Sequence, residues 1–138
     1  MISSRAANVT LSSATKAAVS AAAYTTFAVG EATGDGLSYI PPQILLDHLE
    51  AQFDTIAGGA AKVSAFMSYD AAGDVICQPV VEADIYTGKT TATKCAALWS
   101  IDSAVRKPAA YKGDTKLYVH FKLDAGTANL TPFLHWGV

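Results

Sequence analysis

The stretch from Leu117 to Leu123 constrains the fold of this chain more than any other. Apolar residues occupy its odd positions, while Tyr118, His120 and Lys122 lie between them. This period of two is typical of a β-strand that buries one face and exposes the other. The pattern therefore predicts a sheet protein in which this strand lies against a core.

A tight turn and a second strand follow. Residues 124–127 interrupt the alternation, and Gly126 can adopt the positive φ that a short turn often needs. Apolar residues then recur on one parity as far as Trp136. We expect the two strands to pair as a hairpin. Pro132 has no N–H to donate, which predicts that the return strand lies at a sheet edge or carries a bulge.

Earlier parts of the chain show further short strands separated by turns rich in Gly, Asp and Pro. A loop of about 12 residues is expected from Asp102 to Gly113. About seven or eight strands in this arrangement predict an all-β, or mainly β, sandwich. Jelly-roll and immunoglobulin-like connectivities both fit, and we favour a jelly-roll-like one. The expected strands before the C-terminal pair are 22–29, 62–69, 75–78, 80–86 and 92–101.

One segment has a different period and predicts an inserted amphipathic α-helix at about 42–57. Pro41 and Pro42 are suited to the first helical turn. Gly58 and Gly59 supply a stop signal. Four large apolar residues then form one stripe at spacings of four, four and three: Leu45, Leu49, Phe53 and Ile56.

The N-terminal 20 residues are small and polar, with few large apolar side chains. They predict an extended arm that orders against something else, followed by a single domain at 21–138. Charged residues make up 16% of the chain, against about 25% in typical soluble domains. Alanine accounts for 26 residues. A surface so poor in charge indicates that other chains cover part of it.

The charge balance excludes several classes of partner. The formal net charge is −2, so there is no strong field to attract nucleic acid or an anionic membrane. The start of the chain lacks the pattern of a signal peptide, and no apolar run has the length of a membrane helix. We expect a soluble chain made in the cytoplasm, with no direct contact to nucleic acid or membrane.

Candidate chemical groups are few, and none forms a known catalytic or cofactor motif. His48 follows Asp47 on the expected helix, where the two do not face each other. His120 and His135 are at best diagonal neighbours on the expected hairpin, facing solvent or an interface. We predict no catalytic residue, no metal site and no cofactor.

Other polar groups receive structural interpretations. Cys77 and Cys95 are expected to be half-buried thiols, with a disulfide possible only if their strands pair. Glu82 and Asp84 share one face of a strand and could act as a carboxylate pair, but a solvated face is the simpler interpretation. The basic residues around Tyr111 could contact nucleic acid or an acidic protein, although a solvated loop is favoured: Arg106, Lys107, Lys112 and Lys116.

Two stretches, KVSAFMSYDAAGDVI at 62–76 and KLYVHFKLDAGTANLTPFLHW at 116–136, resemble segments of small virion proteins of tailed bacteriophages. These proteins include capsid decoration (cement) proteins. The resemblance implies a non-enzymatic structural protein on the capsid surface, a homo-oligomer (a trimer favoured) that binds the major capsid protein or other virion proteins. The residues that we expect to make the assembly contact are Ile2, Val9, Leu11, Arg106, Lys107 and Tyr111.

Two alternatives remain open at this point. One is a tail, connector or fibre-associated structural protein. The other is a carbohydrate-binding module that stacks sugars on Trp99, Tyr111, Tyr118 and Trp136. The two tryptophans lie on the apolar parity of their strands, so we expect them in the core instead.

Overall fold

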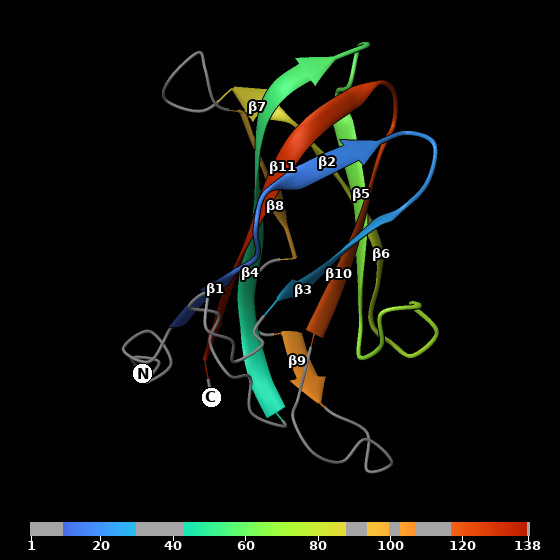
Figure 1. The fold of residues 1–138 in the computed structure, drawn as a ribbon. Helices are drawn as coiled ribbons and strands as arrows, with labels where there is room; N and C mark the ends of the chain where they lie inside the picture. Colours follow the sequence, from blue (N-terminus) through green and yellow to red (C-terminus); the bar gives the residue numbers. More distant parts are fainter. Residues whose placement is uncertain (1–9, 30–42, 88–93, 100–102, 107–116, 138) are drawn as a thin grey trace.

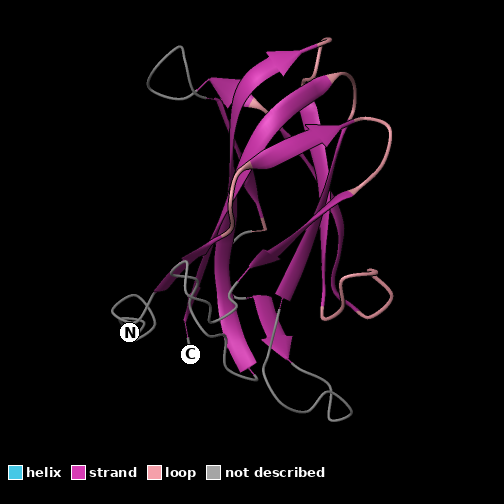
Figure 2. Ribbon diagram, viewed as in Figure 1, coloured by secondary structure: helices cyan, strands magenta, loops and turns pink. Residues whose placement is uncertain are grey.

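The chain forms two antiparallel β-sheets packed face to face (Figures 1 and 2). The structure is a computed structural model that describes residues 10–29, 43–87, 94–99, 103–106 and 117–137. Every regular element within these residues is a strand. The predicted all-β sandwich is therefore confirmed.

Within the described residues, sheet A contains seven strands and sheet B contains four. In sheet A, β11 and β4 are the central pair, with β1 and β2 both beside β11 and with β8 and β9 both beside β4. Sheet B has the order β3-β10-β5-β6. Sheet A comprises β1 (Thr10–Ser13), β2 (Ala17–Ser20), β4 (Gln43–Ala57), β7 (Tyr86–Thr87), β8 (Lys94–Leu98), β9 (Ser103–Arg106) and β11 (Thr127–Gly137); sheet B comprises β3 (Thr25–Val29), β5 (Lys62–Ser68), β6 (Ile76–Asp84) and β10 (Leu117–Leu123).

The chain changes sheet at most of its connections. It passes from β2 to β3, from β3 to β4 and from β4 to β5, each time from one sheet to the other. It does so again from β6 to β7, from β9 to β10 and from β10 to β11. This alternation is consistent with the jelly-roll-like connectivity that the sequence favoured.

The expected C-terminal hairpin is wrong in its pairing. The strands β10 and β11 exist close to the predicted bounds, but β10 lies in sheet B and β11 in sheet A. The cross-strand partners of β10 are β3 and β5. The short turn between β10 and β11 therefore joins the two layers of the sandwich.

The predicted helix at 42–57 is also wrong, because this segment is the longest strand, β4. The buried residues Leu49, Ala51 and Phe53 keep the period of two. A register shift in the pairing of β4 with β11 then places Leu46, three residues before Leu49, on the buried side as well. A second shift lies near Thr55, which has φ 54°. Such bulges insert an extra residue and so imitate helical spacing.

Pro132 lies in a central strand, contrary to the expected edge or bulge. It pairs with Ala51 of β4 on one side. On the other side β2 pairs with residues 127–130 and β1 pairs with residues 133–136, so the gap between β1 and β2 lies opposite Pro132. The missing N–H of proline explains why this neighbouring strand is broken in two.

Other predicted regions differ in detail. Residues 103–106 of the expected loop form β9, which pairs with β4. Residues 10–13 and 17–20 of the expected arm form β1 and β2. The rest of that loop, residues 107–113, and the first nine residues lie outside the described part of the chain.

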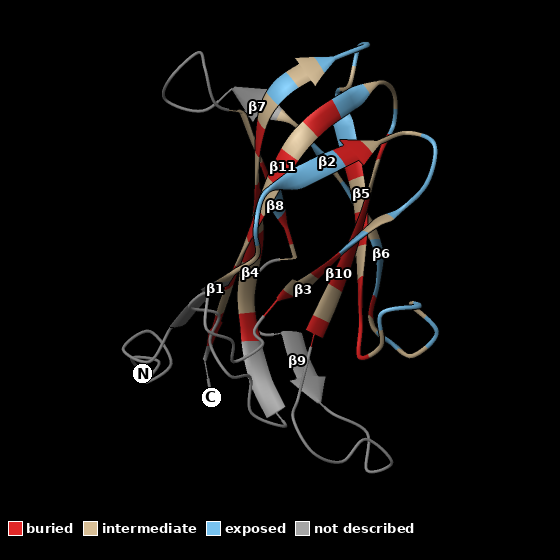
Figure 3. Cartoon of the chain, viewed as in Figure 1, coloured by how far each residue is buried: buried red, intermediate tan, exposed pale blue. Residues whose placement is uncertain are grey.

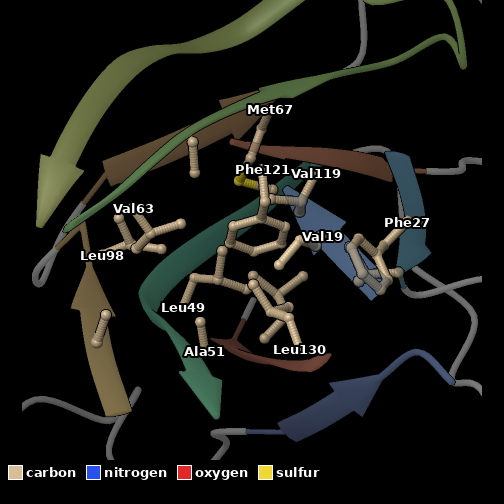
Figure 4. Packing of buried hydrophobic residues seen from close by; sticks show 14 of the residues in the cluster. Val19, Phe27, Leu49, Ala51, Val63, Met67, Leu98, Val119, Phe121 and Leu130 are labelled. Carbon is tan, nitrogen blue, oxygen red and sulfur yellow. The ribbon is translucent and has the colours of Figure 1, made fainter. Parts of the chain in front are cut away.

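The core lies between the two sheets (Figure 3), where the odd positions of β10 are buried as the alternation predicts. Val119 and Phe121 of sheet B face Leu49 and Leu130 of sheet A across this layer (Figure 4). Trp136 is 7% exposed and belongs to the core. The preferred interpretation of this tryptophan is therefore confirmed.

Three connections meet at one end of the sandwich through bare glycine backbone. A Cβ atom on Gly58 would lie 2.7 Å from the Cα of Gly126. The carbonyl of Gly126 also accepts a hydrogen bond of 3.1 Å from the N–H of Ala21. Asp124 accepts two more at 3.0 Å, from the N–H groups of Ala61 and Lys62. These bonds lower the pKa of the Asp124 carboxyl.

Replacing Gly126 with alanine should destabilise the protein more than the same change at Gly59. Both residues have positive φ, at 68° and 82°, which costs an L-residue about 1–2 kcal/mol. The new Cβ at position 126 would also lie 2.0 Å from the carbonyl oxygen of Ala57, whereas nothing lies within 4 Å at position 59. Urea unfolding of both variants measures the difference, and equal losses would contradict this account.

Candidate functional site

His120 is the most buried ionisable side chain of the described residues, at 2% exposure, although it points to the outer face of sheet B. Phe66 stacks on its ring with centroids 4.3 Å apart. The turn after β5 covers both rings, since a Cβ on Gly73 would lie 3.0 Å from Phe66 and 3.4 Å from His120. The expectation that His120 faces solvent or an interface is therefore wrong.

Two hydroxyl groups hold the imidazole of His120. Its Nε2 lies 2.7 Å from Oγ of Ser68 and its Nδ1 lies 2.8 Å from Oγ1 of Thr26. The hydroxyl of Ser68 donates to the backbone carbonyl of Asp70 at 2.6 Å. Because that hydrogen is used, Ser68 accepts from the Nε2–H of His120, and the Nδ1 of His120 accepts from Thr26.

This polarity distinguishes the cluster from a nucleophile–base pair. A serine nucleophile directs its hydrogen at histidine, which removes it as a general base. Here histidine directs its hydrogen at Ser68 instead. Burial lowers the pKa of His120, partly opposed by the charge of Asp70, so the ring is held in the neutral form that these bonds require. The cluster ties β10 to β3 and β5.

The other two histidines of the chain form a pair on sheet A. His48 and His135 are register partners on β4 and β11, with their rings stacked at 3.9 Å. The Nδ1 of His48 lies 2.7 Å from Oδ2 of Asp47, so the expectation that these two residues do not face each other is wrong. Burial lowers the pKa of His135, as does His48, while Glu50 and Asp47 oppose the shift.

Neither the His120 cluster nor the His48–His135 pair forms a metal site. Among the described residues no group of three or more His, Cys, Asp or Glu side chains could hold a metal ion. Cys77 and Cys95 are free, half-buried thiols, as expected. They lie on β6 and β8, which belong to different sheets, so the condition for a disulfide is not met. Burial raises the pKa of Cys77 to about 12, and it also raises that of Cys95.

The remaining candidate residues are scattered. Glu82 and Asp84 are exposed on β6, and Glu82 lies 3.5 Å from Nζ of Lys62. Trp99 packs against the core, and Tyr118 is half-buried on sheet B. The backbone of Leu11 pairs with His135, and that of Arg106 pairs with Gln43. Lys112 and Lys116 lie outside the described part of the chain. So do the other expected contact residues, which are Ile2, Val9, Lys107 and Tyr111.

The two edges of sheet B differ in a way that the sequence did not reveal. The edge strand β6 shows two register shifts against β5, contains the exposed Pro79, and carries exposed Glu82 and Asp84. Bulges, proline and charge are the devices that prevent an edge strand from pairing with another chain. The apolar side chains of Ile76 and Val80 are 54% and 55% exposed on this irregular strand.

The opposite edge, β3, has none of these devices. All five of its residues pair with β10 in continuous register. It contains no proline and no charged residue, and no described strand pairs with its other side. The edge strands of sheet A are shorter, with four residues each in β1, β2 and β9 and two in β7. We call β3 the open edge; it is the strongest candidate for an interaction site.

Comparisons with known proteins find structural likeness only. No protein-family model matches the chain, and no curated protein matches its sequence. A chain of the cyanophage Pam1 capsid asymmetric unit is similar with a TM-score of 0.39 and 11% identity, over 95% of this chain and 85% of that one. A chain of sacbrood virus of honeybee has a TM-score of 0.38 and 11% identity, over 94% and 70%. At these scores the likeness assigns neither a family nor a function.

The structure also bears on the membrane. The described part of the chain includes no helix that is long and apolar enough to span one.

Replacing Ser68 with alanine should lower the free energy of unfolding by about 1–3 kcal/mol, because it leaves the Nε2–H of His120 buried without its acceptor. The matched control is Ser64→Ala, on the same face of β5 but only half-buried. Thermal unfolding of both variants makes the comparison. A loss at position 64 as large as that at position 68 would count against the hydrogen-bonded cluster.

Stability should fall as the pH drops below about 6.5. Burial lowers the pKa of His120 and His135 in the folded state from 6.5, so just below that pH the unfolded chain binds more protons. The carboxyls of Asp54, Asp70 and Asp124 have pKa values lowered from 3.8, and their contribution is lost only at more acid pH.

Urea unfolding between pH 7 and about pH 5 therefore isolates the two histidines. The variants His120→Gln and His135→Gln should each show a shallower decline than the wild type. A wild-type profile that stays flat over this range would overturn the prediction.

Proposed function

We propose that the chain is a non-enzymatic structural protein of a virus particle, and specifically a decoration protein on the capsid of a tailed bacteriophage. The open edge β3 is the observation that carries the proposal. An unprotected edge presents a row of main-chain donors and acceptors that another chain can extend by strand addition. We call β6 the blunted edge, because its bulges, proline and carboxylates protect it from such pairing. In sheet B, strand addition is therefore expected at β3 only.

Two further considerations support a virion role. Jelly-roll-like sandwiches serve in viral capsids, although they also serve in lectins. The resemblance of residues 62–76 and 116–136 to phage virion proteins favours the first use. The stacking surface of the carbohydrate-binding alternative loses one of its four members, because Trp136 lies in the core.

The proposed mechanism is a clamp repeated over many copies. The sandwich would sit on the outer shell, with the major capsid protein as its partner, after synthesis in the host cytoplasm. The first nine residues, with Ile2 and Val9, would reach across to neighbouring subunits. Many weak contacts on one particle together resist detachment through their high effective concentration.

Fractionation of particles tests the proposal. An antibody against the chain, applied to particles purified on a density gradient, should detect it on the outer surface, at a copy number comparable to that of the major capsid protein. Chain found only at the top of the gradient would overturn the virion role. A few copies at one vertex would favour the tail or connector alternative.

Removal of residues 1–9 tests the arm. This variant should no longer co-sediment with particles stripped of the protein, and a thermal melt beside that of the full chain checks that it still folds. Unchanged co-sedimentation would exclude the arm as the contact.

A further inference from the structure

The open edge is anchored to sheet B by side chains on both of its faces. Phe27 and Val29 point into the core, and the Phe27 ring meets that of Phe121 edge-on at 5.5 Å. On the outer face, the hydroxyl of Thr26 is bonded to His120. The side of the β3 backbone with which no described strand pairs is therefore extended before any partner arrives, which lowers the entropic cost of binding.

The open edge is also compatible with itself. A two-fold axis at Phe27 would pair Thr25 with Val29 of a second copy and Thr26 with Ala28. No charged residue occurs from Ala17 to Val29, so no like charges would meet across such a contact. An interface around a two-fold axis needs this self-complementarity, because each residue faces the same surface that it belongs to.

The blunted edge fails the same requirement. On β6 the carboxylates of Glu82 and Asp84 would enter the contact from both copies. The residues Pro79 and Val80 lie opposite Phe66 alone, so this strand bends away from regular pairing. Of the two edges of sheet B, only β3 suits a second copy.

We infer that β3 pairs antiparallel with β3 of a second copy, which joins two four-stranded sheets B into one continuous sheet across a two-fold axis. The inference rests on the same open edge as the proposed function and names its partner there as another copy of this chain. It replaces the expected trimer with a dimer, because an edge that pairs with itself is used up by one partner.

The solution mass of the purified protein tests this inference. Light scattering over a dilution series should show the mass approaching twice 14.4 kDa at high concentration. Ala28→Lys places a charge on the outer face of the open edge and should weaken association by at least about tenfold. The matched control Val80→Lys, on the blunted edge, should dimerise like the wild type, and all three proteins should melt alike at dilutions where the wild type is monomeric.

Hydrogen exchange locates the contact without any variant. The β3 amides of the wild type should exchange more slowly at high concentration than at low, while those of β6 should not change. A wild-type protein that stays monomeric, forms a trimer, or shows no protection of β3 overturns the inference. A monomer that still co-sediments with particles would refute only the inference, and a dimer absent from particles would refute only the proposed function.

Discussion

The contact between Gly58 and Gly126 is the constraint on which the rest of the sandwich depends. A chain that changes sheet at most connections must bring several crossings together at the ends of the layers. Here Gly58 of the β4–β5 connection touches Gly126 of the β10–β11 connection with no side chain between them. The N–H of Ala21, in the β2–β3 connection, donates a hydrogen bond to the carbonyl of Gly126. Any Cβ at position 126 would collide with backbone, so only glycine allows the two sheets to close at their core spacing.

With the two sheets closed, the layer between them can be apolar, while hydrogen bonds between polar side chains connect strands on the outer face. His120 belongs to the outer face of sheet B and is nevertheless buried, because Phe66 and the turn at Gly73 cover it. Its bonds to Thr26 and Ser68 connect three adjacent strands. This is why the edge strand β3, only five residues long, keeps a regular extended backbone. The candidate interaction site thus depends on a buried polar group in the neighbouring strand.

The proposed function rests on the two edges of sheet B. The two edge strands of sheet B pack against the same core, but they differ in how their outer backbone is protected from pairing with another chain. One carries bulges, a proline and two carboxylates, and the other carries none of these. A sheet that needed no partner would gain from blunting both edges. The asymmetry therefore supports our proposal that β3 is the side through which this sandwich joins a larger assembly.

The sequence by itself determined that the protein is a β-sandwich, because alternation at 117–123 and turn residues report local geometry. It could not show that β4 is a strand, since bulges near Asp47 and Thr55 turn its apolar spacing into that of a helix. Nor could it show that β10 and β11 lie in different sheets, or that Pro132 lies in a central strand. Both facts depend on pairing with strands that are distant in the sequence. The burial of His120 and the open edge were likewise decided only by tertiary structure, as both arise from contacts between residues far apart in the chain.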